Sequence, residues 1–252
     1  MGLSDDIYEI VPGIRTFQTT LNRYVSFVPP PPPTDPGTPR RILLVTSHPV
    51  RESFSLAIAQ TIEEEARERG HEVQRIDLGL EGFRPVLTAS EWKSYGDDTT
   101  KRLWRLPRDV RGYIKKLQWC DTLFLVYPTW WMNTPANLKG FFDRTLLMHH
   151  TWDLPPIEDE APSLLSSLVP QGLTPKLTNI HRLVGVSTYG APRSALLMAG
   201  DNGRNMIYSA VLPLFAADCT IRWHGLYEMD ATTEGTRASF LEEVRNSVRE
   251  NL

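Results

Sequence analysis

The pattern of apolar and polar residues from position 40 onward alternates between short strand-like segments and longer segments with helical spacing. Strands are predicted at 42–45, 73–78, 122–126, 183–187 and 219–223. The run at 122–126 is apolar throughout, as a strand covered on both faces must be. Helices are predicted at 54–69, 90–95, 99–119, 135–147, 203–216 and 233–250. This alternation predicts one parallel sheet with right-handed crossovers.

Glycine and proline residues mark the limits of several of these elements. Gly70 follows the first helix, and Pro135 stands in the first turn of a later helix, where its missing N–H removes no helical hydrogen bond. Residues 153–178 contain five prolines and show no clear periodicity. They are therefore predicted to form a long loop.

The first 39 residues differ from the rest of the chain. Five consecutive prolines at 29–33 are followed by two more within the next six residues, a composition that predicts an extended polyproline spacer. Residues 1–28 carry considerable apolar area, so we expect this arm to dock on its own domain or on a neighbouring subunit. The predicted organisation is an N-terminal arm and linker at 1–39 and one α/β domain at 40–252.

Composition and charge narrow the possible partners. The chain has 252 residues, of which 41% are hydrophobic, enough for one sizeable core. Its net charge of −3 gives no general attraction to nucleic acid or anionic membranes. No apolar run approaches the ~20 residues needed to span a bilayer. Acids near Met1 and Gly2 are atypical of a secretory signal or a myristoylation signal.

The chain contains two cysteines, Cys120 and Cys219. Each stands beside a predicted buried strand, where a free cysteine behaves as a small hydrophobic residue. A disulfide or a reactive thiol is the alternative. A reducing, cytoplasmic location is the expected setting. No set of metal ligands is predicted.

Ligands of an open α/β sheet bind at the carboxyl ends of its strands, and three loops there are unusual. The first, residues 47–55, places His48, Ser53 and Ser55 before a helix, where free N–H groups favour a phosphate. The alternative is that Ser53 only caps the helix and His48 only closes the loop. This loop lacks the Gly-Lys-Ser/Thr of a nucleoside triphosphatase and the glycine fingerprint of a dinucleotide site.

The second loop follows the third strand and reads Tyr127-Pro128-Thr129-Trp130-Trp131-Met132-Asn133-Thr134-Pro135. Two adjacent tryptophans are unfavourable in water, and their faces suit a flat aromatic ligand. A contact with a neighbouring subunit is the alternative, and both hold if the site lies at a dimer interface.

The third loop contains Thr188, Tyr189 and Gly190 after the fourth strand. Gly190 permits close approach of the backbone, and the two preceding residues add hydroxyl groups. A tight turn without a ligand is the alternative. Together, the three loops can hold one phosphorylated ligand with a planar, polar-edged ring. A flavin nucleotide fits that description best.

The chain resembles the NAD(P)H:quinone oxidoreductase family of flavodoxin-like flavoproteins over about residues 41–250. The resemblance rests on several motifs, which are His48-Pro49 with Ser53-Phe54-Ser55, Tyr127-Pro128-Thr129-Trp130-Trp131, the run 135–144, Leu177-Thr178-Asn179-Ile180 and Thr188-Tyr189-Gly190. It implies a doubly wound five-stranded parallel sheet in the order 2-1-3-4-5, a homodimer and bound FAD, or FMN as in some relatives.

The resemblance also implies roles for the residues of each loop. The phosphate side of the flavin is expected to contact His48, Ser53, Phe54 and Ser55. One edge and face of the ring is expected to contact Pro128, Thr129, Trp130, Trp131 and Met132, and its pyrimidine end Thr188, Tyr189 and Gly190. The usual double glycine of the third loop is Gly190-Ala191 here.

The hypothesis for the reaction is that NADPH or NADH passes a hydride to the flavin and leaves, and that a quinone or similar small aromatic acceptor then takes its place. In this ping-pong scheme the flavin performs the redox chemistry and the protein orients it. The candidate catalytic residues are Tyr189, as a hydrogen-bond donor, and His149 or His150, as proton donors near the quinone. For the two histidines, a solvated helix end is the competing interpretation.

Two other functions compete with this hypothesis. A flavodoxin-like electron carrier would bind flavin without reacting with a reduced nicotinamide. A regulatory or docking protein would keep the fold and bind a partner through the arm.

Overall fold

A computed structural model describes residues 38–95, 101–155 and 172–251. Its main sheet has five parallel strands in the order β2-β1-β3-β6-β7. They are β1 (Arg41–Thr46), β2 (Glu72–Asp77), β3 (Thr122–Thr129), β6 (Arg182–Tyr189) and β7 (Thr220–Leu226). The five predicted strands and the order 2-1-3-4-5 are therefore confirmed. Residues 1–37, most of the predicted arm and linker, lie outside the described residues.

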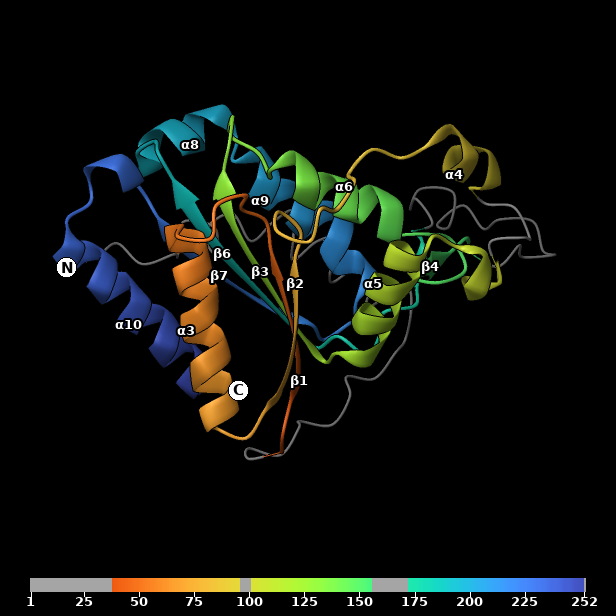
Figure 1. Ribbon diagram of the computed structural model, residues 1–252, viewed down its shortest axis with the longest axis horizontal. Helices are drawn as coiled ribbons and strands as arrows, with labels where there is room; N and C mark the ends of the chain where they lie inside the picture. Colours follow the sequence, from red (N-terminus) through yellow and green to blue (C-terminus); the bar gives the residue numbers. More distant parts are fainter. Residues whose placement is uncertain (1–37, 96–100, 156–171, 252) are drawn as a thin grey trace, which may run out of the picture.

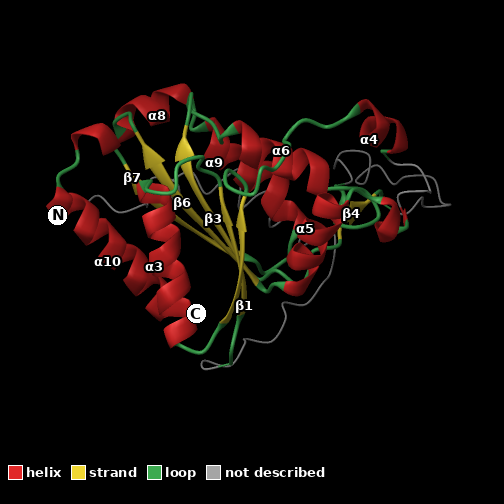
Figure 2. Ribbon diagram, in the orientation of Figure 1, coloured by secondary structure: helices red, strands yellow, loops and turns green. Residues whose placement is uncertain are grey.

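Helices cover both faces of the sheet (Figures 1 and 2). Alternate side chains of the strands pack against opposite layers of helices. Ile42 and Leu44 of β1 pack in one cluster with α3 (Phe54–Glu68) and α10 (Glu234–Asn251). Leu43 and Val45 face the other layer, which includes α5 (Arg108–Trp119) and α6 (Ala136–Thr145). Because both faces are covered, the strands carry apolar residues at nearly every position.

Several element boundaries differ from the prediction. The helix predicted at 99–119 starts only at Arg108, after a short 3-10 turn at Leu103–Arg105 and after Pro107, because a residue before proline disfavours helical backbone. The helix predicted at 203–216 is three pieces: α9 (Asn202–Met206), a π-helical turn (Ile207–Val211) and a 3-10 turn (Leu212–Leu214). Two short helices, α4 (Ala89–Ser94) and α8 (Arg193–Ala199), and a 3-10 turn at Met229–Ala231 complete the described helices.

The predicted loop 153–178 contains a two-residue strand near each of its ends. β4 (Trp152–Asp153) pairs antiparallel with β5 (Thr174–Pro175), and residues 156–171 between them are outside the described part of the chain. Cys120 is fully buried, as expected for a small hydrophobic residue, whereas Cys219 is only partly buried, and the two do not form a disulfide. No helix in the described ranges is long and apolar enough to cross a membrane.

Candidate functional site at the carboxyl edge of the sheet

The three loops singled out in the sequence follow β1, β3 and β6, which are adjacent in the sheet. Since these strands are parallel, their carboxyl ends lie at one edge, on the side of α8 and α9 (Figure 1). The register places Pro128 opposite Thr188 and Thr129 opposite Tyr189. The structure therefore brings the three predicted loops together at a single edge.

The first loop is ordered by its own hydrogen bonds. Ser53 caps α3, and its hydroxyl accepts a bond from the Leu56 N–H at 3.3 Å. The Nδ1 atom of His48 accepts from the Val50 N–H at 3.1 Å, and the His48 ring lies 6.0 Å from the ring of Trp130. The capping and loop-closing roles of Ser53 and His48 are thus present, and the free N–H groups of the first turn of α3 stay at the edge.

The other residues expected around a phosphate in this loop are mostly turned inward. Ser55 is buried, and Phe54 packs on the apolar cluster beneath α3 and α10, with its ring 6.4 Å from that of Phe240. In contrast, the hydroxyl of Ser47, directly after β1, is buried and has no hydrogen-bond partner in the described structure. A buried hydroxyl without a partner is unfavourable and is what a ligand or water satisfies.

The second loop is a tight turn with left-handed backbone at two residues that are not glycine. Trp130 and Asn133 exchange two backbone hydrogen bonds of 3.0 Å, and between them Trp131 has φ 52° and Met132 has φ 57°. These torsions match the primed turns that usually require glycine or asparagine. Such strain persists only where the surroundings enforce it, and it is concentrated at functional sites.

This turn directs its aromatic residues outward. Trp131 is 99% exposed and Trp130 is 46% exposed. Trp130 lies beside the His48 ring, whereas the exposed ring of Trp131 is open to a ligand or to a neighbouring subunit, the two contacts that the sequence predicted. Beside the turn, the buried Thr134 hydroxyl has no hydrogen-bond partner in the described structure. It is a second buried polar group that a ligand could satisfy.

The remaining residues of the second loop belong to the strand. β3 continues through Thr129, further than the sequence predicted, so Pro128 is buried within the sheet. The hydroxyl of Thr129 is 2.8 Å from that of Ser187, which also donates to the Tyr127 carbonyl at 3.0 Å. These bonds join β3 to β6 below the turn and fix the spacing of the second and third loops.

The third loop points its tyrosine into the protein. Tyr189 is buried, its hydroxyl accepts a bond from Trp223 Nε1 at 3.0 Å, and its ring stacks on Tyr227 at 4.7 Å. Burial, together with the nearby Asp201 carboxylate, raises the pKa of Tyr189 well above its ordinary value. The hydroxyl predicted to donate to a flavin therefore faces the interior, and the backbone of Thr188 to Gly190 is what lies at the edge.

Two glycines give this region its close packing. A Cβ atom on Gly185 would overlap the ring of Trp223, so glycine at that position makes room for the indole that holds Tyr189. A Cβ on Gly190 would lie 3.3 Å from the Asp230 carboxylate. The third loop is thus confined between the sheet and the segment that follows β7 (Thr220–Leu226).

The histidines predicted as proton donors lie elsewhere. His149 and His150 follow α6, which runs away from the carboxyl end of β3. His149 Nδ1 is 2.9 Å from Asp153, and the His150 carbonyl accepts a bond from Gln118, near the end of α5 and close to the start of β3. The structure therefore does not bring these histidines together with the three loops.

The sequence interpretation missed the residues that begin α9. The Asn202 N–H donates to the Met132 carbonyl at 3.1 Å, and Gly203 packs directly on Thr134. A signal in the sequence is the turn-forming series Gly200, Asp201, Asn202, Gly203, which stands at the start of the helix predicted at 203–216.

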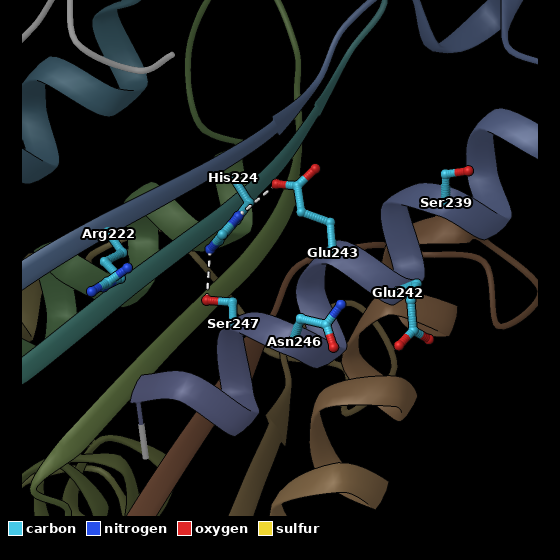
Figure 3. Close-up of a pocket in the computed structure, with 7 residues that line it drawn as sticks. All are labelled: Arg222, His224, Ser239, Glu242, Glu243, Asn246 and Ser247. Atoms are coloured by element: carbon cyan, nitrogen blue, oxygen red, sulfur yellow. Dashed lines mark hydrogen bonds and ion pairs between the residues drawn. The ribbon is translucent and has the colours of Figure 1, made fainter. Parts of the chain in front are cut away.

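A separate cleft of about 560 Å³ lies between β7 and α10 (Figure 3). In it His224 contacts Glu243 through Nδ1 and Ser247 through Nε2, both at 2.8 Å. This resembles the hydrogen-bonding order of a hydrolytic triad. However, Ser247 is inside a helix whose N–H groups bond to its own carbonyls, so they cannot stabilise an oxyanion. We interpret the three residues as a link between β7 and α10.

The sheet order and the loops at its carboxyl edge define a protein of the flavodoxin-like class. A family described as having a flavodoxin-like fold matches residues 40–206, more than half of the chain. The chain therefore belongs to that family.

Two curated relatives share part of the sequence. The uncharacterized NAD(P)H oxidoreductase YcaK of Escherichia coli K12 is 36% identical over 107 residues, covering 41% of this chain and 51% of that protein. NAD(P)H dehydrogenase [quinone] 1 of Rattus norvegicus is 28% identical over 134 residues, covering 49% of each chain. The chain thus spans about half the length of the curated relatives it matches.

A solved structure is similar over a larger part of the chain. The NAD(P)H:quinone oxidoreductase from Methanothermobacter marburgensis superposes with a TM-score of 0.64 and 22% identity, covering 84% of this chain and 97% of that one. At this identity the similarity shows the shared fold.

Proposed function

We propose that this protein is a flavin-dependent NAD(P)H oxidoreductase that reduces quinones or similar small aromatic acceptors. The observation that carries the proposal is the strained turn at 130–133, which presents Trp131 at the carboxyl edge beside two buried hydroxyls without partners. The names of the curated relatives support the reaction class.

The residues at this edge fit a flavin nucleotide. The first turn of α3, with Ser53 and the unpartnered Ser47 hydroxyl, suits its phosphate side. Trp130, Trp131 and Met132 would form a wall against the ring, together with the exposed side of Thr129. Backbone groups of Thr188 to Gly190 would meet the pyrimidine end, where negative charge develops on reduction.

When bound, a flavin can accept a hydride from a reduced nicotinamide and pass reducing equivalents to an acceptor. The protein's own contribution is to bind and orient the reacting molecules. The ring of Trp131 is in solvent at the carboxyl edge, so we expect the flavin to be reached from that side. The nicotinamide and the quinone would bind there in turn, which gives ping-pong kinetics.

The proposal gives none of the three predicted catalytic residues a catalytic role. Tyr189 supports the third loop through Trp223 and Tyr227, and its hydroxyl is not at the edge. His149 and His150 lie beyond the end of α6, where His150 contacts the end of α5, and not at the carboxyl edge of the sheet. We therefore do not assign them to proton transfer at that edge. Solvent at the open edge is then the source of the proton for the reduced quinone.

The proposal also includes the assembly and the setting of the protein. Residues 40–252 form the flavin-binding domain, and the exposed Trp131 adjoins a second copy in a homodimer, with the arm at 1–39 available for the same contact. FAD or FMN is the cofactor, and NADPH or NADH the reductant. Cys120 and Cys219 do not form a disulfide, which supports a reducing cytoplasm as the setting.

The proposal is tested by anaerobic titration of the flavin-loaded protein with NADH and NADPH, followed by addition of a quinone. We expect one of the two to bleach the flavin absorbance and the quinone to restore it. Steady-state rates at several fixed quinone concentrations should give parallel double-reciprocal lines. Protein that binds flavin but is bleached by neither nicotinamide would be an electron carrier, and the enzymatic proposal would be wrong.

A further inference from the structure

A short segment, residues 200–203, contacts both the second and the third loop; we call it the bridge segment. On one side it holds the strained turn. The Asn202 N–H donates to the Met132 carbonyl at 3.1 Å. A Cβ atom on Gly203 would lie 2.8 Å from the Thr134 nitrogen and 3.0 Å from the Asn133 carbonyl carbon. The backbone of the bridge segment therefore packs directly on the backbone of the second loop.

On its other side the bridge segment reaches the third loop through Asp201. This residue is 4% exposed, and its carboxylate lies 3.5 Å from the Tyr189 hydroxyl. Its backbone is left-handed, with φ 35°, a conformation that glycine, asparagine and aspartate adopt more readily than other residues. The Asp201 carbonyl accepts a bond from the Asn205 N–H at 2.9 Å, so the same residue also begins α9.

These contacts matter because the turn is strained. Trp131 and Met132 both have positive φ, and each strained residue costs about 1–3 kcal/mol unless its surroundings enforce it. The Met132 carbonyl is at the tip of the turn, and its bond to Asn202 connects that tip to the rest of the protein. Without this bond, the turn is free to relax toward ordinary torsions.

We propose that the bridge segment sets the separation of the second and third loops, and that Asp201 and Gly203 are positioning residues for the flavin. The proposal deepens the proposed function and rests on it for the ligand. The contacts themselves are properties of the protein without a ligand. Their loss should therefore be measurable before any flavin is added.

The test compares Gly203→Ala with Gly112→Ala. Both glycines lie in helices with negative φ, so both variants gain similar helical propensity. They differ in that a Cβ on Gly112 meets nothing within 4 Å, whereas one on Gly203 collides with the second loop. The pair therefore separates the collision from the general effect of replacing glycine.

The first measurement is hydrogen exchange of the flavin-free protein. We expect peptides covering residues 129–134 to exchange about tenfold faster in Gly203→Ala than in the wild type, since exchange reports local opening. The Gly112→Ala variant should match the wild type. The second measurement is the dissociation constant for FMN and FAD, which should rise at least about tenfold in Gly203→Ala, because a misplacement of ~1 Å can cost up to about a hundredfold.

A second pair of variants tests the side facing the third loop. Asp201→Asn keeps an acceptor for the Tyr189 hydroxyl and tolerates left-handed backbone, whereas Asp201→Ala does neither. We expect Asp201→Asn to retain most of the flavin affinity and the slow exchange of residues 129–134. Asp201→Ala should lose both. This pair also decides the question if Gly203→Ala does not fold.

The outcomes separate this proposal from the proposed function. Unchanged exchange and unchanged flavin affinity in folded Gly203→Ala and Asp201→Ala would show that the segment is ordinary packing, and would overturn the inference. Faster exchange with unchanged flavin affinity would overturn the positioning role. If the wild type binds neither flavin, the proposed function is wrong and the positioning role falls with it, while unchanged or faster exchange still reports whether the segment holds the turn.

Discussion

The second and third loops leave neighbouring strands at the same edge, yet they place their aromatic residues oppositely. Trp131 is 99% exposed, whereas Tyr189 is 1% exposed. Tyr189 is the last residue of β6 and still pairs with Thr129, so the pleat of the strand decides its direction. Trp131 lies beyond the ladder, in a turn whose positive φ directs its side chain outward.

The type of residue at a strand end therefore does not by itself identify a ligand contact. A hydroxyl or an aromatic ring that is still inside the ladder is directed by the sheet and finds partners in the core. The side chain of a residue past the last ladder position is not directed by the sheet and is available to a ligand. In this protein the second loop is the open wall of the candidate site, and the third loop offers its backbone.

The largest expected effect comes from removing the buried aromatic ring. Tyr189→Ala should lower the free energy of unfolding by about 3–5 kcal/mol, the usual range for a buried large aromatic residue. Urea denaturation followed by circular dichroism measures this. A loss below ~1 kcal/mol would show that Tyr189 is not the core residue described above.

Tyr189→Phe isolates the hydroxyl of the same side chain. It removes the acceptor for Trp223 Nε1 and leaves that buried donor without a partner. The free energy of unfolding should fall by about 1–3 kcal/mol. Because Tyr189→Phe also removes the contact with Asp201, the turnover number for quinone reduction at saturating flavin should fall by no more than about tenfold, whereas the loss of a general acid in the reaction typically costs 10²–10⁴-fold. A fall of that larger size would restore the catalytic role for the hydroxyl.

Trp131→Ala tests the open wall. Because Trp131 makes no buried contact in the protomer, the free energy of unfolding should change by no more than about 0.5 kcal/mol. The dissociation constant for the flavin should rise about tenfold, since a stacked aromatic face contributes ~0.5–1.5 kcal/mol beyond the area it buries. Trp104→Ala, at another exposed tryptophan, is the matched control and should leave the affinity unchanged.

The smallest expected effect lies at the opposite edge of the sheet. His71 accepts a bond from the Arg40 N–H at 3.1 Å, and burial, with Arg69 and Arg40 nearby, lowers the pKa of His71 below its ordinary 6.5. The unfolded chain then binds more protons, so the free energy of unfolding falls as the pH drops below about 6.5.

His71→Gln should flatten this dependence while leaving flavin affinity unchanged. Urea denaturation of both proteins at pH 5.5 and 7.5 measures it. The wild type should lose more stability than the variant at the lower pH. An equal loss in the two proteins would show that His71 is not the titrating group.

Much of the fold could be predicted because strands alternate with helices along the sequence. Helices of this length between strands favour a parallel sheet with right-handed crossovers. The missed features are local. α8 is only seven residues long, and the proline at 107 delays the start of α5. The helix predicted at 203–216 changes hydrogen-bonding pattern twice, which residue spacing does not reveal.

The position of the candidate site could be predicted, but not the direction of each side chain. Parallel strands necessarily bring their carboxyl ends together, so the three loops had to meet. The inward turn of Tyr189 depends on Trp223, which is 34 residues away, and on the space left by Gly185. The place of His149 and His150 depends on the end of α6, and the bridge segment carries no motif of its own.

The proposal that this protein binds a flavin nucleotide is tested most directly by the identity and amount of flavin that the chain holds. The purified protein, incubated with FMN and FAD and freed of excess ligand, would be denatured and the released compounds identified and quantified by mass spectrometry. We expect close to one flavin per chain, of one kind in clear preference. Protein that releases no flavin and takes up neither compound would contradict the proposed flavin-dependent function.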